Sequence, residues 1–100
     1  MVEVKFTTHL QRYFPALQRV EAVHGDTVAE VLANLEARFP GLAAYLVDER
    51  GALRPHVNIF IGEEMIQDRQ GLKDTVASGD RLFVFQALSG GSNSAKERNK

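Results

Sequence analysis

The sequence predicts an α+β fold in which a mixed sheet of four to five strands packs against one main helix. Apolar and polar residues alternate over residues 2–7, which is the period of a strand with one buried face. A single apolar stripe over residues 28–39 predicts one amphipathic helix. A nearly continuous apolar run over residues 82–85 predicts a buried strand late in the chain. One helix covers one face of a small sheet, so these observations together predict a two-layer sandwich.

The first two strands are expected to form a hairpin with a long connection. The first strand covers residues 2–7 and places one face on the core. Residues 9–16 break the alternation, and Pro15 cannot donate to a ladder, so a loop turns the chain back here. Residues 17–23 then predict a second, weaker strand.

The helix has the clearest pattern in the chain. Thr27 and Glu30 fit a capping box, in which each side chain satisfies a backbone N–H at the helix start. The apolar stripe consists of Val28, Val31, Leu32, Leu35 and Phe39. Pro40 and Gly41 end the helix, and residues 42–47 predict a further short helical turn.

The C-terminal part of the chain predicts three more extended segments. Residues 57–61 predict the third strand, and residues 65–66 predict a short fourth strand or an extended piece. A tight turn at residues 78–80 leads into the last strand, residues 81–87.

The last strand is most easily buried in the middle of the sheet, beside the first strand and covered on both faces. A parallel pairing of the first and last strands would give the β-grasp, or ubiquitin-like, arrangement.

Composition limits the function. The chain has 100 residues, 44% of them hydrophobic, which suits one domain with a single core. The formal net charge is -1 with both signs interspersed, so binding to nucleic acid or an anionic membrane is disfavoured. No cysteine is present, which excludes thiolate chemistry and disulfides. The N-terminus lacks a signal-peptide pattern, and no apolar run approaches the roughly 18 residues that span a bilayer. We therefore expect a cytoplasmic protein that is a monomer with transient partners.

No catalytic or metal site is predicted. Ser89 has no plausible base beside it in the sequence, and adjacent carboxylates fall only in predicted turns, where solvation is usual. The histidines lie in separate segments without the spacing of a metal site: His9, His24 and His56. No phosphate-binding loop is present.

Several aromatic residues have two interpretations. Phe60, on the opposite face of the third strand, and Phe85 either are buried or help to form an apolar sheet surface that docks a partner. Burial is the more ordinary outcome for such side chains. Tyr13 and Phe14 in the first loop carry the same ambiguity.

The last strand leads directly into a glycine pair. Gly90 and Gly91 carry no Cβ, so the backbone there fits a narrow groove in a partner. Residues 92–100 contain one apolar residue and no periodicity, which predicts a disordered extension. We therefore divide the chain into a domain over residues 1–91 and an extension over residues 92–100.

Several segments, in their order and spacing, resemble the small sulfur carriers of the MoaD/ThiS type. The resemblance covers residues 2–91. The segments are Gly25-Asp26-Thr27-Val28-Ala29-Glu30-Val31-Leu32-Ala33-Asn34-Leu35, Phe39-Pro40-Gly41-Leu42, Val57-Asn58-Ile59-Phe60-Ile61, Leu72 with Ser78-Gly79-Asp80, and Ala87-Leu88-Ser89-Gly90-Gly91.

The resemblance implies a β-grasp protein whose terminal glycine is the working group. In such carriers an E1-like enzyme uses ATP to adenylate the glycine carboxylate, and a sulfur donor converts it to a thiocarboxylate. The sulfur then passes to a biosynthetic enzyme. Gly91 would be the activated residue, with Gly90 and Ser89 as the flexible arm. No residue of this chain would be catalytic, and no cofactor would be bound.

The chain departs from the family pattern at two places. Ser92 follows the second glycine, so Gly91 is peptide-bonded and has no free carboxylate. This implies a precursor cut between Gly91 and Ser92, in some relatives by a zinc metalloprotease of the JAMM type. Gln86 stands where a proline is common, and the turn at residues 62–64 lacks the usual Asn-Gly.

Three functions remain open from the sequence. The first is the sulfur carrier. The second is a ubiquitin-like modifier joined through Gly91 to lysines of target proteins. The third is a β-grasp binding module that keeps the fold without the chemistry, so that its tail is never removed.

Overall fold

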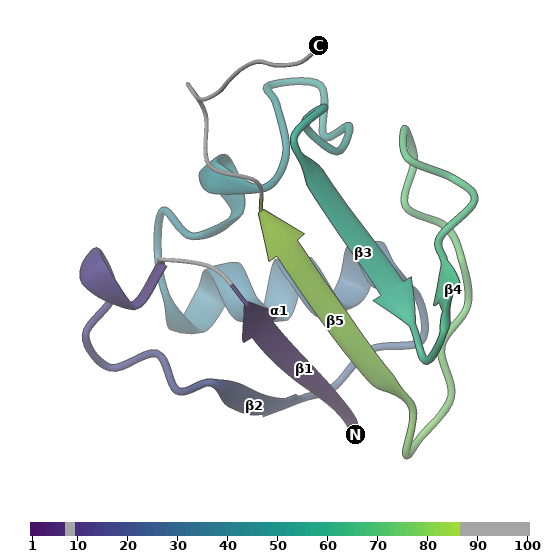
Figure 1. Ribbon diagram of the computed structural model, residues 1–100, viewed down its shortest axis with the longest axis horizontal. Coiled ribbons are helices and arrows are strands. Elements are labelled where there is room, and N and C mark those ends of the chain that lie inside the picture. The colour runs from purple at the N-terminus through teal and green to yellow at the C-terminus, as the bar shows by residue number, and fades with distance from the viewer. Residues whose placement is uncertain (8–9, 87–100) are drawn as a thin grey trace, which may run out of the picture.

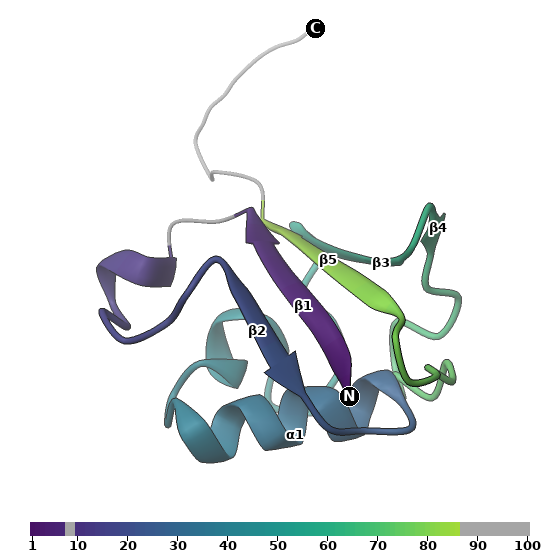
Figure 2. The ribbon, with the colours of Figure 1, turned by 90° about the horizontal axis from the view of Figure 1, so that it is seen from below.

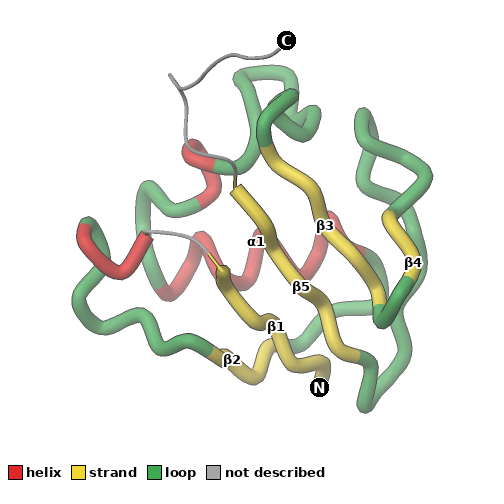
Figure 3. The backbone as a smooth tube through the Cα atoms, viewed as in Figure 1, coloured by secondary structure: helices red, strands yellow, loops and turns green. Residues whose placement is uncertain are grey.

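The computed structural model describes residues 1–7 and 10–86. Thr8, His9 and residues 87–100 lie outside the described part of the chain. Figures 1 and 3 show one sheet with one main helix behind it. The elements in chain order are β1 (Val2–Thr7), η1 (Leu10–Arg12), β2 (Val20–Val23), α1 (Val28–Arg38), η2 (Ala43–Tyr45), β3 (Val57–Ile61), β4 (Glu64–Met65) and β5 (Arg81–Gln86).

The sheet has five strands in the order β2-β1-β5-β3-β4. The first and last strands pair in parallel, with Val4 opposite Leu82, while β3 runs antiparallel to β5, with Ile59 opposite Val84. The expected parallel pairing of the chain ends is therefore confirmed, and β5 lies in the middle of the sheet. This order and these directions are those of the β-grasp.

The first hairpin forms as expected, but its second strand is shorter than predicted. β1 and β2 are antiparallel, and β2 begins at Val20 instead of residue 17. The backbone N–H of Gln18 donates to the carboxylate of Glu21 at 2.8 Å, and that of Leu17 donates to the Phe14 carbonyl, which makes a turn. Those N–H groups are unavailable to a strand ladder, so Leu17 reaches the core from a loop.

The helix begins as the sequence predicts. The hydroxyl of Thr27 accepts from the backbone N–H of Glu30 at 3.2 Å. The Glu30 carboxylate accepts from the N–H of Asp26, one residue before the donor of a standard capping box. The helix ends at Arg38, with Phe39 as its C-cap. Pro40 cannot continue it.

The core lies between the helix and one face of the sheet. Figure 2 shows α1 on that side, with the opposite face of the central strands uncovered. No helix in residues 1–7 and 10–86 is long and apolar enough to cross a membrane. The most completely buried side chains are Val2, Val4, Leu10, Val28, Val31, Leu35, Leu42, Leu46, Val57, Ile59, Leu82 and Val84.

One expectation about β5 is wrong. The strand was predicted to be covered on both faces, but only Leu82 and Val84 are buried. Phe83 is half-buried and Phe85 is 40% exposed. The cause is the number of layers: the one main helix covers a single face, and successive side chains of a strand point to opposite faces.

Candidate functional site

The predicted activation site follows the last residue of β5 that the structure describes. Gln86 ends β5, and Gly91 comes five residues later in the sequence. The predicted arm residues Ser89 and Gly90, Gly91 itself and the predicted processing position Ser92 all lie outside the described residues. The described residues nearest to this predicted site are those that surround the end of β5.

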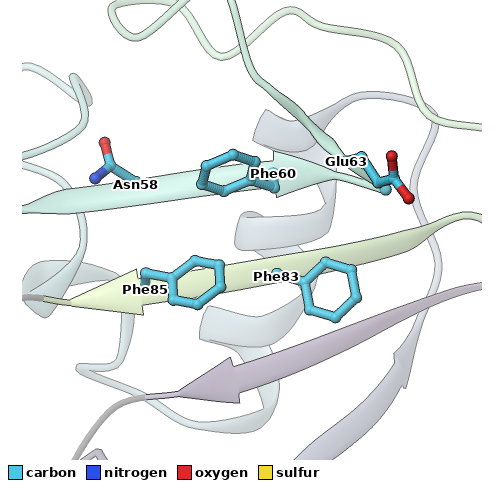
Figure 4. Close-up of a pocket in the computed structure, with 6 residues that line it drawn as sticks. Asn58, Phe60, Glu63, Phe83 and Phe85 are labelled. Carbon is cyan, nitrogen blue, oxygen red and sulfur yellow. The ribbon is translucent and has the colours of Figure 1, made fainter.

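An aromatic face, made of Phe60, Phe83 and Phe85, occupies the uncovered side of the sheet (Figure 4). Phe60 and Phe83 are register partners on neighbouring strands. The rings of Phe60 and Phe85 have their centroids 5.5 Å apart and meet edge to face at 83°. Of the two readings left open for Phe60 and Phe85, the geometry is that of an apolar sheet surface. Phe83 was missed, although its position two residues from Phe85 places both on one face.

The aromatic face continues into a row that crosses the sheet. The registers place Val20 opposite Lys5, Lys5 opposite Phe83, Phe83 opposite Phe60, and Phe60 opposite Met65. Val20 and Met65 are exposed at the two ends of the row. This row is thus apolar at its centre and at both ends and is interrupted by the cation of Lys5, and the ion pair of Glu3 with Arg81 lies beside it on the same face.

A shallow groove of about 650 Å³ lies over this surface. Its lining residues are Asn58, Phe60, Gly62, Glu63, Phe83 and Phe85. The Asn58 side chain is fixed because its Oδ1 accepts from the Arg69 guanidinium at 3.0 Å. The same guanidinium donates to the Val57 carbonyl at 2.8 Å, so Arg69 holds the start of β3 beside the end of β5. The groove therefore has an apolar floor, one oriented amide and the carboxylate of Glu63.

The helix side of the sheet also carries aromatic side chains beside Gln86, the last described residue before the predicted arm. The Gln86 amide donates from Nε2 to the Tyr45 carbonyl at 3.4 Å. The Tyr45 ring stacks on Tyr13 with a centroid distance of 5.3 Å and meets Phe14 edge to face at 5.8 Å. The sequence left Tyr13 and Phe14 ambiguous because their partner comes from η2, which no local pattern links to the first loop.

The shifted acids are structural. The pKa of Glu36 is lowered by backbone N–H donors, chiefly that of Gly41. The pKa of Asp48 is lowered chiefly by the backbone N–H of Ala52. The pKa of Asp68 is lowered chiefly by the N–H of Gly71. These carboxylates tie loops and do not line the aromatic groove. Within residues 1–7 and 10–86 no three metal-ligating side chains gather.

Comparison with known families decides the chain's membership. Residues 4–91 match the model of the ThiS family. The chain belongs to the ThiS family. The match begins within β1 and runs through the glycine pair to end at Gly91.

Individual relatives agree with this membership. Sulfur carrier protein CysO of Mycobacterium tuberculosis is 33% identical over 76 residues, which cover 74% of this chain and 82% of that protein. Small archaeal modifier protein 3 of Haloferax volcanii is 35% identical over 65 residues, covering 65% of this ThiS-family chain and 70% of the relative.

Solved structures show the same fold. A chain of the BexX/CysO complex from Amycolatopsis orientalis has a TM-score of 0.78 and 30% identity, over 91% of this chain and 100% of that one. CysO of Mycobacterium tuberculosis has a TM-score of 0.77 and 30% identity, and the match covers 88% of this chain and 100% of that chain. The resemblance to MoaD/ThiS-type carriers and the β-grasp fold, both expected from the sequence, are confirmed.

Proposed function

We propose that this protein is a sulfur carrier whose working group is the carboxylate of Gly91, freed by removal of residues 92–100. One observation supports this above all others. The ThiS-family match includes both glycines and ends at Gly91, although the chain continues to Lys100. Relatives at 33% identity carry the name of sulfur carrier.

The chemistry has three steps. Water hydrolyses the peptide bond between Gly91 and Ser92, which frees the Gly91 carboxylate and the Ser92 amine. A carboxylate oxygen then attacks the α-phosphorus of ATP and expels pyrophosphate, which gives an acyl adenylate. A hydrosulfide equivalent attacks the acyl carbon and AMP leaves, so oxygen is replaced by sulfur without a change of oxidation state. The unhindered glycine leaves the acyl carbon open to this attack.

The chain itself contributes binding and presentation, not catalysis. An E1-like enzyme and a sulfur-using enzyme would each dock on the aromatic face and receive the arm. Fully extended, residues 87–91 span at most about 17 Å, so an enzyme's reacting atoms must lie within that distance of the end of β5. Half-exposed aromatic side chains suit such docking because they bury a large apolar area at low conformational cost.

The proposal is tested by intact mass. The full chain is incubated with a JAMM-type protease, and the product with an E1-like enzyme, ATP and sulfide. We expect the mass to fall to that of residues 1–91 and then to rise by the exchange of one oxygen for one sulfur. Gly91→Ala should slow both steps. Gly51→Ala adds the same methyl group at a surface turn outside the arm. Its φ of 85° makes this substitution somewhat destabilising, but processing and sulfur transfer should proceed as in the wild type.

Two results separate the alternatives. If the full chain persists in its own cell while the pathway is active, the carrier is wrong and the binding module stands. The second candidate, a protein modifier, is favoured by the similarity to small archaeal modifier protein 3. Conjugates of higher mass in cell extract that vanish on deletion of Gly91 would establish it.

A further inference from the structure

A second exposed aromatic surface lies beside the arm's base, away from the aromatic face. We call it the tyrosine flank and define it as Arg12, Tyr13 and Tyr45. The two rings stack nearly parallel, with an interplanar angle of 15°. Tyr13, which directly follows η1, is 59% exposed, and Tyr45, the last residue of η2, is 37% exposed, although Leu10 of η1 and Leu46 after η2 are buried in the core.

The position of the flank is fixed relative to the arm. Along β5, Phe85 points to the uncovered face of the sheet and Gln86 to the helix side. The Gln86 amide donates to the carbonyl of Tyr45 itself, so the flank is one side chain away from the last described residue of β5. Figure 1 shows η1 and η2 on the same side of the molecule as the end of β5. Gln86, the last described residue before the predicted arm, thus lies between the aromatic face and the tyrosine flank.

The two segments that form the flank carry positive charge only. Residues 10–19 contain Arg12 and Arg19 and no acid, and residues 39–47 contain no charged side chain. The ion pairs found among the described residues join Arg38 to Glu21 and Arg81 to Glu3, so neither arginine of the first loop is neutralised by one.

The acids that adjoin η2 are Glu36, whose carboxylate accepts from the backbone N–H groups of Gly41 and Ala43, and Asp48 and Glu49, which follow η2 in the sequence. The Asp48 carboxylate accepts from the backbone N–H groups of Arg50 and Ala52, and its pKa is lowered mainly by the latter bond. Asp48 is therefore committed to its own loop, and Arg50 and Arg54 lie close enough to offset its charge.

We infer that the tyrosine flank is a second contact surface for the activating enzyme, and that the enzyme surface facing it is acidic. This inference rests on the proposed function. An enzyme that encloses the arm at its base must cover both sides of β5, and the aromatic face supplies only one. Stacked tyrosines offer rigid apolar area with polar edges, and Arg12 offers a planar cation that fits a carboxylate. Charge complementarity of this kind raises the rate of association and fixes orientation.

The test measures carrier-dependent ATP–pyrophosphate exchange by the E1-like enzyme, with residues 1–91 of the carrier. Arg12→Glu and Tyr13→Ser should each raise the KM for the carrier about tenfold and leave kcat unchanged. Tyr13→Phe keeps the stack and should match the wild type. Added salt should raise the wild-type KM more than that of Arg12→Glu, because the removed charge is what salt screens.

Lys73→Glu is the matched control. Lys73 is exposed and follows Leu72, whose carbonyl accepts from the Ala29 N–H at the start of α1, whereas η2 follows the end of that helix. The same charge reversal there should leave the KM unchanged. Thermal unfolding of each variant shows that the fold is kept.

Three outcomes would contradict the inference, and they distinguish its failure from that of the proposed function. If the wild type is activated and both variants keep its KM, the flank is not a contact surface and the carrier function stands. If Tyr13→Ser changes the sedimentation of the carrier alone, the flank joins two copies of the chain and the inference is wrong. If residues 1–91 are not adenylated at all, the proposed function falls and takes the inference with it.

Discussion

The two sides of β5 differ in a way that separates stability from function. Leu82 and Val84 point to the helix and are 1% and 0% exposed, whereas Phe85 on the other side is 40% exposed. Both sides are apolar, yet only one is covered. A domain that leaves neighbouring phenylalanines uncovered on its central strand keeps a surface that packing alone does not require. The comparison supports our proposal that alternate residues of this one strand stabilise the fold and bind the partner enzyme.

The largest expected effect is on the covered side. Leu82→Ala removes a fully buried side chain from the middle of the sheet and leaves a cavity under the helix. We expect the free energy of unfolding to fall by about 2–5 kcal/mol, measured by urea denaturation. A loss below about 1 kcal/mol would mean that the core at β5 relaxes around the gap, and the proposed division of the strand would be wrong.

The next effect is on the uncovered side and concerns binding. Phe85→Ala removes an edge-to-face contact with Phe60 and should cost only about 0.5–1.5 kcal/mol of stability. Its KM with the E1-like enzyme should nevertheless rise by about tenfold or more, since aromatic anchors dominate interfaces. Val20→Ala, at the far edge of the row that runs through Phe83 and Phe60, serves as the control and should change the KM little. If the two variants raised the KM equally, binding would not be concentrated at the aromatic face, and the proposed docking role of Phe85 would be wrong.

The sequence predicts the fold well because the periods that define it are local. The stripe that ends at Phe39 and the alternation from Val2 identify helix and strand without tertiary information. The start of β2 was missed because the Glu21 side chain binds the Gln18 N–H and competes with the ladder. A propensity argument does not include such a bond.

The candidate site was harder to predict for two physical reasons. An apolar run such as residues 82–85 looks the same whether a second layer covers it or not, and only the element count shows that Phe83 and Phe85 lack cover. The stack of Tyr13 on Tyr45 joins segments far apart in the sequence. The glycine pair, in contrast, is visible in the sequence alone.

The smallest expected effect concerns the loop after β4, which should contribute to stability but not to binding through the aromatic face or the tyrosine flank. The Asp68 carboxylate accepts from the N–H groups of Gln70, Gly71 and Lys73, which keeps its pKa below the ordinary 3.8. A carboxyl whose pKa is lowered by folding stabilises the fold above its unfolded pKa, and that contribution is lost as pH falls through the folded pKa. In acid, at and below the ordinary value, wild-type stability should therefore decline more steeply than that of Asp68→Asn, as followed by thermal unfolding. At neutral pH the variant should be slightly less stable than the wild type but bind the E1-like enzyme with an unchanged KM, because the loop lines neither the aromatic groove nor the tyrosine flank. A raised KM at neutral pH would mean that this loop, through Arg69 and Asn58, orients the aromatic face.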